Sequence, residues 1–169
     1  MKETKIGVIS DTHYSNRLNQ NLPIEKIKQA FKQATLIIHA GDITNICLLD
    51  ILGEIAPVEA VCGNMDDAGI GSVLQRKKII DIDGISVGIM HGFGSHEGFP
   101  GKISKFFEGD KLDAIVFGHT HTPFNEVING ILYFNPGSPV KPALPYPPSV
   151  GLLTITGPHC ISASIKPIL

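Results

Sequence analysis

Three short apolar runs mark the first part of the chain. They cover residues 5–10 ("KIGVIS"), 35–40 ("TLIIHA") and 57–62 ("PVEAVC"). Runs of this length, rich in β-branched and aliphatic residues, are typical of strands that are buried on both faces of a parallel sheet. We therefore predict three strands at these positions.

Helical patterns fill the gaps between these runs. Pro23 is well placed to start a helix over residues 23–33, in which Ile27 and Phe31 recur at helical spacing. Residues 44–55 are predicted to form a second helix with Thr44 as its N-cap. An order of strand, helix, strand, helix, strand predicts a parallel sheet with right-handed crossovers.

The second half of the chain changes to paired strands. Asp83-Gly84 and Asn129-Gly130 are hairpin signals between alternating runs, and a third antiparallel pair is expected around Gly157-Pro158. A short helix near residues 98–108 and a strand over 113–118 are expected between the first two hairpins, and residues 141–148 form a proline-rich loop. The predicted fold class is α/β: a two-sheet mixed β-sandwich flanked by helices, built as a single domain over residues 1–169.

Composition narrows the classes of function. A chain of 169 residues with 43% hydrophobic residues can bury one proper core, which argues against disorder. The formal net charge is −2 and there is no basic run, so we expect no dedicated nucleic-acid surface. No apolar stretch reaches the ~18 residues that a membrane span needs, so we expect no membrane contact.

The cysteines point to a reducing compartment. Cys47, Cys62 and Cys160 are an odd number without a CxxC pair, which argues against a disulfide framework and against a cysteine zinc site. The N-terminal residues pass directly into a strand-like run with no secretory pattern. We therefore expect a cytoplasmic protein.

Polar residues with metal-binding chemistry follow five of the predicted strands. The carboxyl ends of strands in open α/β sheets meet at one edge, and glycines beside four of the five sets allow tight turns. Seven ligands are too many for one tetrahedral zinc ion, but they suit two ions that share a bridging carboxylate. We predict a dinuclear metal site at the carboxyl ends of the strands, with these ligands: Asp11, His13, Asp42, Asn64, His91, His119 and His121.

Charge and ligand type indicate what this site binds. Two divalent ions bring +4, whereas Asp11 and Asp42 return −2, so the surplus positive charge should attract a phosphate. Mixed nitrogen and oxygen ligands suit transition metals better than magnesium or calcium. Manganese is our first choice as the cofactor, with nickel, iron, zinc and cobalt as alternatives.

The motifs "DTH", "GD", "GN", "HG" and "GHTH", in this order and spacing, resemble the calcineurin-like metallophosphoesterase superfamily. The short chain and "NPGS" (135–138) resemble its small prokaryotic phosphodiesterase branch. The resemblance implies a phosphodiesterase in which a metal-bridging hydroxide attacks phosphorus, with Asp42, Asn64 and His91 as catalytic residues. It also implies one ion held by Asp11, His13, Asp42 and His121, and a second held by Asp42, Asn64, His91 and His119, with Asp42 bridging.

Two positions depart from this family's pattern. Many members read GNHD, where the histidine protonates the leaving group or steadies the phosphate, but this chain has Met65 there. A thioether cannot act as a general acid, and losing one typically costs about 10² to 10⁴ in rate. The branch also often reads HGH where this chain has Phe93. We expect substrates with good leaving groups to suffer least from these losses.

Other polar residues near the motifs have plainer interpretations. Asp66 is expected to be structural, Asp67 solvated, and His39 a hydrogen-bonded core histidine. His96 is expected at the surface, with a role as substitute acid as the alternative, and Lys141 is either solvated or in contact with a substrate anion. Two further residues, Asn135 and Ser138, are expected to shape the loop beside the metals.

Two rival functions remain at this stage. A protein of the same fold in the retromer complex serves as a protein-binding subunit, so a non-catalytic, metal-bound scaffold is the main alternative. A metal-dependent hydrolase of a non-phosphate ester is the other. The expected partner is a small phosphate ester in an open pocket, since there is no added cap domain, and the exposed sheet edges of such a fold would allow a homodimer.

Overall fold

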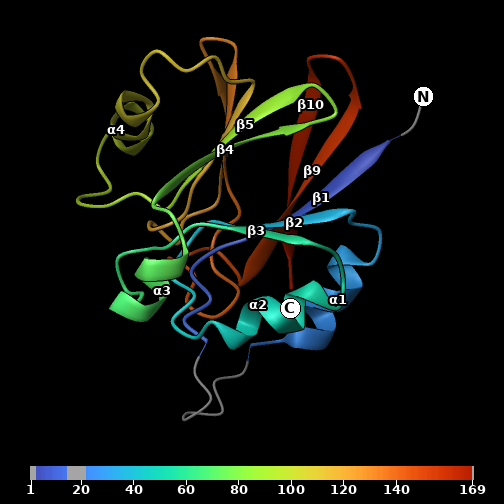
Figure 1. Cartoon of the computed structure of the whole chain (residues 1–169), viewed down its shortest axis with the longest axis vertical. Coiled ribbons are helices and arrows are strands. Elements are labelled where there is room, and N and C mark those ends of the chain that lie inside the picture. Colours follow the sequence, from blue (N-terminus) through green and yellow to red (C-terminus); the bar gives the residue numbers. More distant parts are fainter. Residues whose placement is uncertain (1–2, 15–21, 169) are drawn as a thin grey trace.

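Two five-stranded sheets form the centre of the protein (Figure 1). The computed structural model describes residues 3–14 and 22–168. The first sheet contains, in spatial order, β10 (Cys160–Pro167), β9 (Ser149–Gly157), β1 (Thr4–Ile9), β2 (Leu36–His39) and β3 (Val58–Ala60). The second contains β4 (Lys77–Ile82), β5 (Ile85–Met90), β6 (Ala114–Val116), β8 (Ile131–Asn135) and β7 (Phe124–Ile128).

Both sheets are mixed, as the sequence predicts. Strands β1, β2 and β3 run parallel to one another, and so do β5, β6 and β8. Strands β9 and β10 extend the first sheet in antiparallel fashion, and β4 and β7 do the same at the edges of the second. This arrangement confirms the predicted two-sheet sandwich and the parallel order of its first three strands.

Helices cover the outer faces of the sandwich (Figure 1). Helices α1 (Ile24–Phe31) and α2 (Cys47–Gly53) pack on the first sheet, and α4 (Phe99–Phe106) packs on the second. The central core lies between the sheets, where Val8, Ile38, Val87, Val116 and Phe134 are fully buried. Burial of apolar side chains is the main stabilising contribution to such a fold.

The hairpin turns form where the sequence places them. Asp83 (φ 52°) and Gly84 (φ 81°) join β4 to β5, and Asn129 (φ 51°) and Gly130 (φ 82°) join β7 to β8. Two successive left-handed residues are what a type I′ turn requires, and Asn-Gly and Asp-Gly adopt them at low cost. The third tight turn lies one residue later than Gly157-Pro158, because β9 ends at Gly157 and β10 begins at Cys160.

Two local predictions are wrong. Helix α2 begins at Cys47, and Thr44 does not cap it, because the Thr44 hydroxyl donates instead to the Tyr14 carbonyl at 2.7 Å. The short helix α3 (Ala68–Val73) was not predicted, since its two glycines lower helix propensity. Asp67 is its N-cap and accepts from the Ile70 N–H at 2.9 Å, so Asp67 is not merely solvated.

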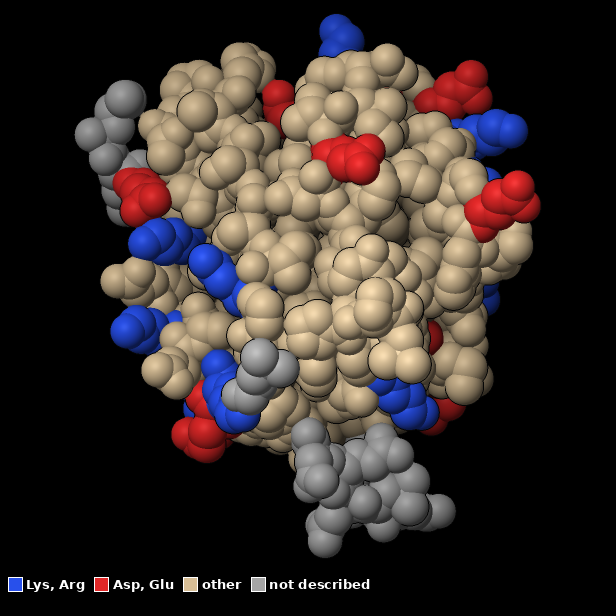
Figure 2. Space-filling model, turned by 180° about the vertical axis from the view of Figure 1, so that it is seen from behind, with Lys and Arg blue, Asp and Glu red and all other residues tan. Residues whose placement is uncertain are grey.

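The charged side chains, the helix lengths and the cysteines can be compared with what the composition predicts. Acidic and basic side chains are interspersed on the face seen in Figure 2. Among the described residues, no helix is long and apolar enough to cross a membrane. All three cysteines are free.

Packing of α1 on the first sheet gives a stability prediction. A Cβ at Gly7 of β1 would lie 2.8 Å from ring carbons of Phe31, and that ring is fully buried. We expect Gly7→Ala to lower the free energy of unfolding by about 1–3 kcal/mol, because the overpacked ring must shift. The matched control is Gly53→Ala at the end of α2, where a Cβ meets nothing within 4 Å. Urea unfolding followed by circular dichroism measures both, and equal midpoints for the two variants would refute the packing argument.

Candidate metal centre

The predicted ligands meet at the carboxyl ends of β1, β2, β3, β5 and β6. Asp11, His13 and His121 offer ligand atoms that all lie within 4.8 Å of one another. Asp11, Asp42 and His91 form a second group by the same measure. Asn64 and His119 lie beside these groups and contact each other, so all seven predicted ligands belong to one region.

Hydrogen-bond donors orient both carboxylates so that one oxygen of each approaches imidazoles. Asp11 Oδ2 accepts from the Ser10 hydroxyl at 2.7 Å, and Asp42 Oδ1 accepts from the Met65 N–H at 2.8 Å. The opposite oxygens approach histidine: Asp11 Oδ1 lies 3.3 Å from His121 Nε2, and Asp42 Oδ2 lies 3.2 Å from His91 Nε2. Asp11 Oδ1 also accepts from the His119 N–H at 3.2 Å, whereas Asp42 Oδ2 faces only imidazoles among the described residues.

His91 is the most informative side chain of the site. Its Nδ1 lies 2.7 Å from the Ala40 carbonyl oxygen, which can only accept, so Nδ1 carries the proton and donates it. The neutral ring then presents a bare lone pair on Nε2. This atom is buried and has no hydrogen-bond partner among the described residues. Two acceptors, Asp42 Oδ2 and His91 Nε2, thus lie 3.2 Å apart with no proton between them in the neutral ring.

His121 repeats this arrangement on the other side of Asp11. Its Nδ1 donates to the Lys141 carbonyl at 2.5 Å, which leaves Nε2 free to face Asp11 Oδ1 and His13 Nε2, the latter at 3.4 Å. A backbone carbonyl on the second ring nitrogen is the usual way in which a protein orients a metal-binding histidine. His13 Nε2 also lies 3.9 Å from Asp42 Oδ2, so Asp42 contacts histidines from both predicted sets.

His119 and Asn64 form a third pair of acceptors. His119 Nε2 lies 2.8 Å from the Gly94 carbonyl oxygen and must donate to it. Nδ1 of the neutral ring is then an acceptor, and it lies 2.8 Å from Asn64 Oδ1. Two acceptors at this distance suit neighbouring ligands of a single ion.

The backbone takes up unusual conformations to build this site. Five of the seven predicted ligands have a left-handed φ between 43° and 69°, which non-glycine residues adopt infrequently. They are Asp11, His13, Asp42, His119 and His121. Each such residue costs about 1–2 kcal/mol, and such outliers cluster where function demands them.

Glycines leave the space that the ligands occupy. A Cβ at Gly63 would lie 2.1 Å from Asp42 Oδ1, and a Cβ at Gly118 would lie 1.9 Å from the Ser10 hydroxyl oxygen. A Cβ at Gly41 would lie 2.7 Å from His91 Nδ1. The glycines next to Asp42, Asn64 and His119 are therefore required for close approach of the ligands.

The donor set fits divalent transition-metal ions. Carboxylate oxygens, imidazole nitrogens and a carboxamide oxygen converge, and a buried lone pair faces a carboxylate without a proton between them. Ions placed among these atoms would remove the mutual repulsion of the acceptors. The residue common to the two groups of close ligand atoms is Asp11, whereas the family pattern makes Asp42 the bridge. The division of ligands between two ions therefore stays a prediction.

The charges of the cluster shift its pKa values. Burial alone raises the pKa of Asp42, but His91 and the Met65 N–H outweigh burial, and the net pKa is lowered. Burial opposes protonation of His91, yet Asp42 and Asp11 raise its pKa. The Asp11 carboxylate raises the pKa of His121, and burial lowers that of His13. The lowered pKa keeps the Asp42 carboxylate ionised at the centre of the site.

Comparison with known proteins identifies the family. Residues 4–157 match the model of the calcineurin-like phosphoesterase superfamily domain. The chain belongs to this superfamily. A probable metallophosphoesterase of Methanothermobacter thermautotrophicus is 39% identical over 152 residues, which cover 90% of this chain and 86% of that protein. A phosphodiesterase of Methanocaldococcus jannaschii is 26% identical over 148 residues, which cover 79% of this chain and 82% of that protein.

Solved structures share the fold. Vps29 of Entamoeba histolytica in complex with zinc superposes with a TM-score of 0.74 at 20% identity, covering 98% of this chain and 100% of the other. A novel archaeal phosphodiesterase superposes with a TM-score of 0.72 at 22% identity, covering 96% and 100%. At these identities, the likeness establishes the phosphoesterase architecture and nothing finer.

Several neighbours of the calcineurin-like site position the ligands. Asp66 accepts from the N–H groups of Thr44 and Gly63, both at 2.7 Å, which ties the β2 loop to the β3 loop and confirms a structural role. Asn135 donates to the Gly118 carbonyl at 2.9 Å, and Ser138 donates to the Asp11 carbonyl at 2.9 Å. The prediction that Asn135 and Ser138 shape the loop beside the ligands is confirmed.

His39 is a core histidine, as expected. The Gly41 N–H donates to its Nδ1 at 3.2 Å, so Nε2 carries the proton and donates to the Thr12 hydroxyl at 3.0 Å. Burial lowers the pKa of His39 to about 3, so the ring is neutral at neutral pH. The neutral His39 ring therefore links the loop after β1, through Thr12, to the loop after β2, through Gly41.

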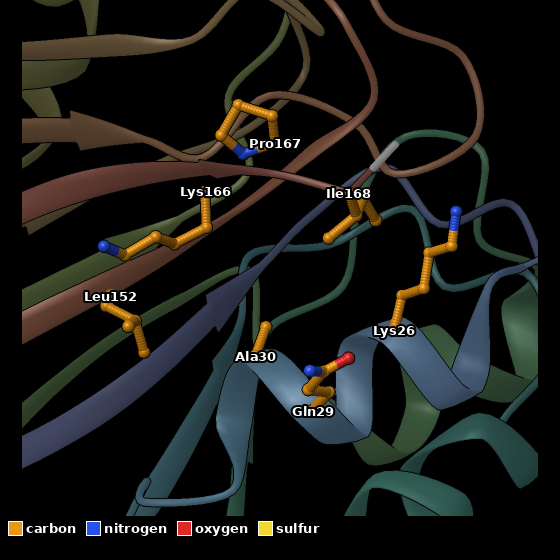
Figure 3. Close-up of a pocket in the computed structure, with 7 residues that line it drawn as sticks. All are labelled: Lys26, Gln29, Ala30, Leu152, Lys166, Pro167 and Ile168. Atoms are coloured by element: carbon orange, nitrogen blue, oxygen red, sulfur yellow. The ribbon is translucent and has the colours of Figure 1, made fainter.

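The hollows of the surface differ in chemistry. One of about 350 Å³ lies between α1 and the end of β10, and its lining includes Lys26, Lys166 and Ile168 but no carboxylate or imidazole (Figure 3). A smaller hollow beside the metal centre is lined by Asn64, His91, Phe93 and Arg76. Arg76 was not predicted as a site residue, because the surrounding residues "QRKK" show no motif of a site.

Removing the predicted bridge tests the centre directly. We expect Asp42→Ala to lose both divalent ions, because Asp42 Oδ2 faces histidines of both predicted sets. Metal analysis after manganese loading and desalting measures this loss. Asp67→Ala is the control: it removes a nearby carboxylate that only caps α3, and it should keep the metal content of the wild type. Two full equivalents in Asp42→Ala would contradict the assignment.

Proposed function

We propose that this protein is a metal-dependent phosphodiesterase that uses two divalent transition-metal ions, with manganese as the first metal to test. The observation that carries the proposal is the buried Nε2 of His91, which in the neutral ring is a lone pair that faces the carboxylates of Asp42 and Asp11. A buried acceptor of this kind is costly unless a cation satisfies it.

The residues divide into ligands and positioning groups. Bound divalent ions would polarise the phosphoryl oxygens and lower the pKa of a water molecule that attacks phosphorus. Asp42, Asn64 and His91 are the proposed catalytic residues, since Asn64 and His91 line the hollow beside the centre and Asp42 Oδ2 lies 3.2 Å from His91 Nε2. Ser10 and the His119 N–H orient the Asp11 carboxylate, and the Met65 N–H orients that of Asp42.

Diesters suit this site better than monoesters. The Met65 side chain is 60% exposed and offers no hydrogen-bond donor, so position 65 contributes only its backbone N–H, which holds Asp42. A monoester presents three non-bridging oxygens, whereas a diester presents two. A site without a donor at position 65 leaves the third oxygen of a monoester with one partner fewer. The similarity to a protein named phosphodiesterase supports the same preference.

A metal-bound scaffold is the second candidate. Vps29 chains share this fold, and an interaction subunit needs exposed apolar surface. Ile46 is 40% exposed and Val73 is 71% exposed, and both line a hollow of about 390 Å³ between the loop before α2 and helix α3. Thr44 and Asp67 line the same hollow and lie two and three residues along the chain from Asp42 and Asn64, so a partner bound there would contact the loops that carry these predicted ligands.

Substrate hydrolysis separates the two candidates. We expect metal-stripped protein, reloaded with manganese, to cleave bis(p-nitrophenyl) phosphate at a higher kcat/KM than p-nitrophenyl phosphate, for the reason given above. Nickel, zinc and magnesium are compared under the same conditions. His119→Ala should lose at least about 10²-fold in rate, since ligand loss commonly costs that much or more.

The control histidine is remote from the site. His159 contacts Asp113 at the surface, so His159→Ala should retain the wild-type rate and the same metal dependence. Two bound ions with no turnover of either ester would reject the enzyme in favour of the scaffold. Turnover that survives complete metal removal would reject both.

A further inference from the structure

A small hollow continues the metal centre on one side. It has a volume of about 60 Å³, and two of its lining residues, Asn64 and His91, are predicted ligands of the same ion. The other lining residues are Cys62, Gly63, Arg76, Met90, Gly92 and Phe93. A space of this size holds about two water molecules, so it suits a few oxygen atoms and not a nucleobase.

The backbone holds Arg76 at this hollow from both sides. The Cys62 N–H donates to the Gln75 carbonyl at 2.9 Å, which ties the residue before Arg76 to the β3 loop. The residue after it, Lys77, is the first of β4 and pairs with Met90 of β5. Arg76 therefore has a fixed place between the loops that carry Asn64 and His91.

The guanidinium of Arg76 differs from the two lysines that follow it in the sequence, because both lysines form ion pairs. Lys77 forms an ion pair with Asp110 at 2.6 Å, and Lys78 pairs with Glu59. Arg76 makes no hydrogen bond or ion pair within residues 3–14 and 22–168. Its charge acts on the Cys62 thiol, which lines the same hollow. A cation beside the ligands is thus left available for a substrate.

The proposed reaction has no general acid at position 65, and Arg76 could take over the stabilisation of the leaving group. When water attacks a diester, the new P–O bond forms and the electron pair of the breaking P–O bond moves to the leaving oxygen. Met65 cannot protonate that oxygen, so its negative charge must be stabilised otherwise until solvent protonates it. A guanidinium does not give up its proton, but its fork of donors stabilises an oxyanion electrostatically.

We propose that Arg76 is a catalytic residue that binds the leaving-group oxygen of a phosphodiester in this hollow and stabilises the charge that develops there. This proposal rests on the proposed phosphodiesterase activity. Phe93 also lines the hollow: the residue is 51% exposed, and its ring packs edge-on against Phe106 at a centroid distance of 5.1 Å. The leaving-group oxygen would therefore bind in a hollow lined by both an aromatic ring and a guanidinium, while the rest of the leaving group stays outside it.

The test changes only the leaving group. Methyl p-nitrophenyl phosphate has a leaving group that tolerates negative charge well, and methyl phenyl phosphate has a poorer one. We expect Arg76→Gln to lower kcat/KM by about 10²-fold for the phenyl ester, as loss of an oxyanion donor does. The p-nitrophenyl ester should lose less than about 10-fold. Arg76→Lys should lie between, because an ammonium keeps the charge without the fork.

A structural role for Arg76 gives a different pattern. Equal losses for the two esters, or no loss for either, would overturn the proposal. Lys111→Gln removes one positive charge from an exposed position outside the hollow, so it should leave the ratio of the two esters unchanged. A change of that ratio in Lys111→Gln would assign the effect to overall charge and would also overturn the proposal.

Binding of inorganic phosphate separates this proposal from the proposed function. If manganese-loaded wild-type protein cleaves neither ester, the phosphodiesterase activity fails on its own. Calorimetry with phosphate then still tests Arg76, because one phosphate oxygen would occupy the leaving-group position. At least about 10-fold weaker phosphate binding by Arg76→Gln supports the anion site, given the strength of charge-assisted hydrogen bonds. Equal phosphate binding by variant and wild type overturns it.

Discussion

The candidate metal centre brings hydrogen-bond acceptors of several side chains close together, and the rest of the structure holds them there. Nε2 of His91 is buried and lies 3.2 Å from Asp42 Oδ2, and Nε2 of the partly exposed His121 lies 3.3 Å from Asp11 Oδ1. Such an arrangement is unfavourable by itself, because buried polar atoms without partners lose their hydration. The rest of the fold holds these atoms in place, and divalent cations are the partners that their chemistry calls for.

The cost of this arrangement is spread over the surrounding structure. Left-handed backbone at five ligands, and glycines whose missing side chains leave room for Asp42 and His91, would be poor choices for stability alone. The two mixed sheets offset this cost through their shared apolar core and through the helices on their outer faces. Hydrogen bonds from Asp66, Asn135 and Ser138 then fix the loops to one another. Residues outside the predicted ligand set thus hold the candidate metal centre in its arrangement.

Most of this could be predicted from the sequence for identifiable reasons. Apolar runs predicted the strands, and Asn-Gly and Asp-Gly predicted two of the turns. The polar residues that follow the strands predicted the cluster of candidate ligands. The cap at Thr44 failed because its hydroxyl bonds to the Tyr14 carbonyl, a contact between residues distant in sequence. Helix α3 was not predicted because its two glycines lower helix propensity, although Asp67 is a residue type that favours the N-cap position. Arg76 could not be singled out, since only the pairing of β4 with β5 and the bond to Cys62 place it beside Asn64.

The most direct test of the account is anomalous X-ray diffraction from crystals soaked in manganese. The account predicts two anomalous peaks on either side of Asp42: one near Asp11, His13 and His121, and one near Asn64, His91 and His119. A single peak within the Asp11, Asp42 and His91 group would contradict the dinuclear centre, and no peak at all would contradict the metal site itself.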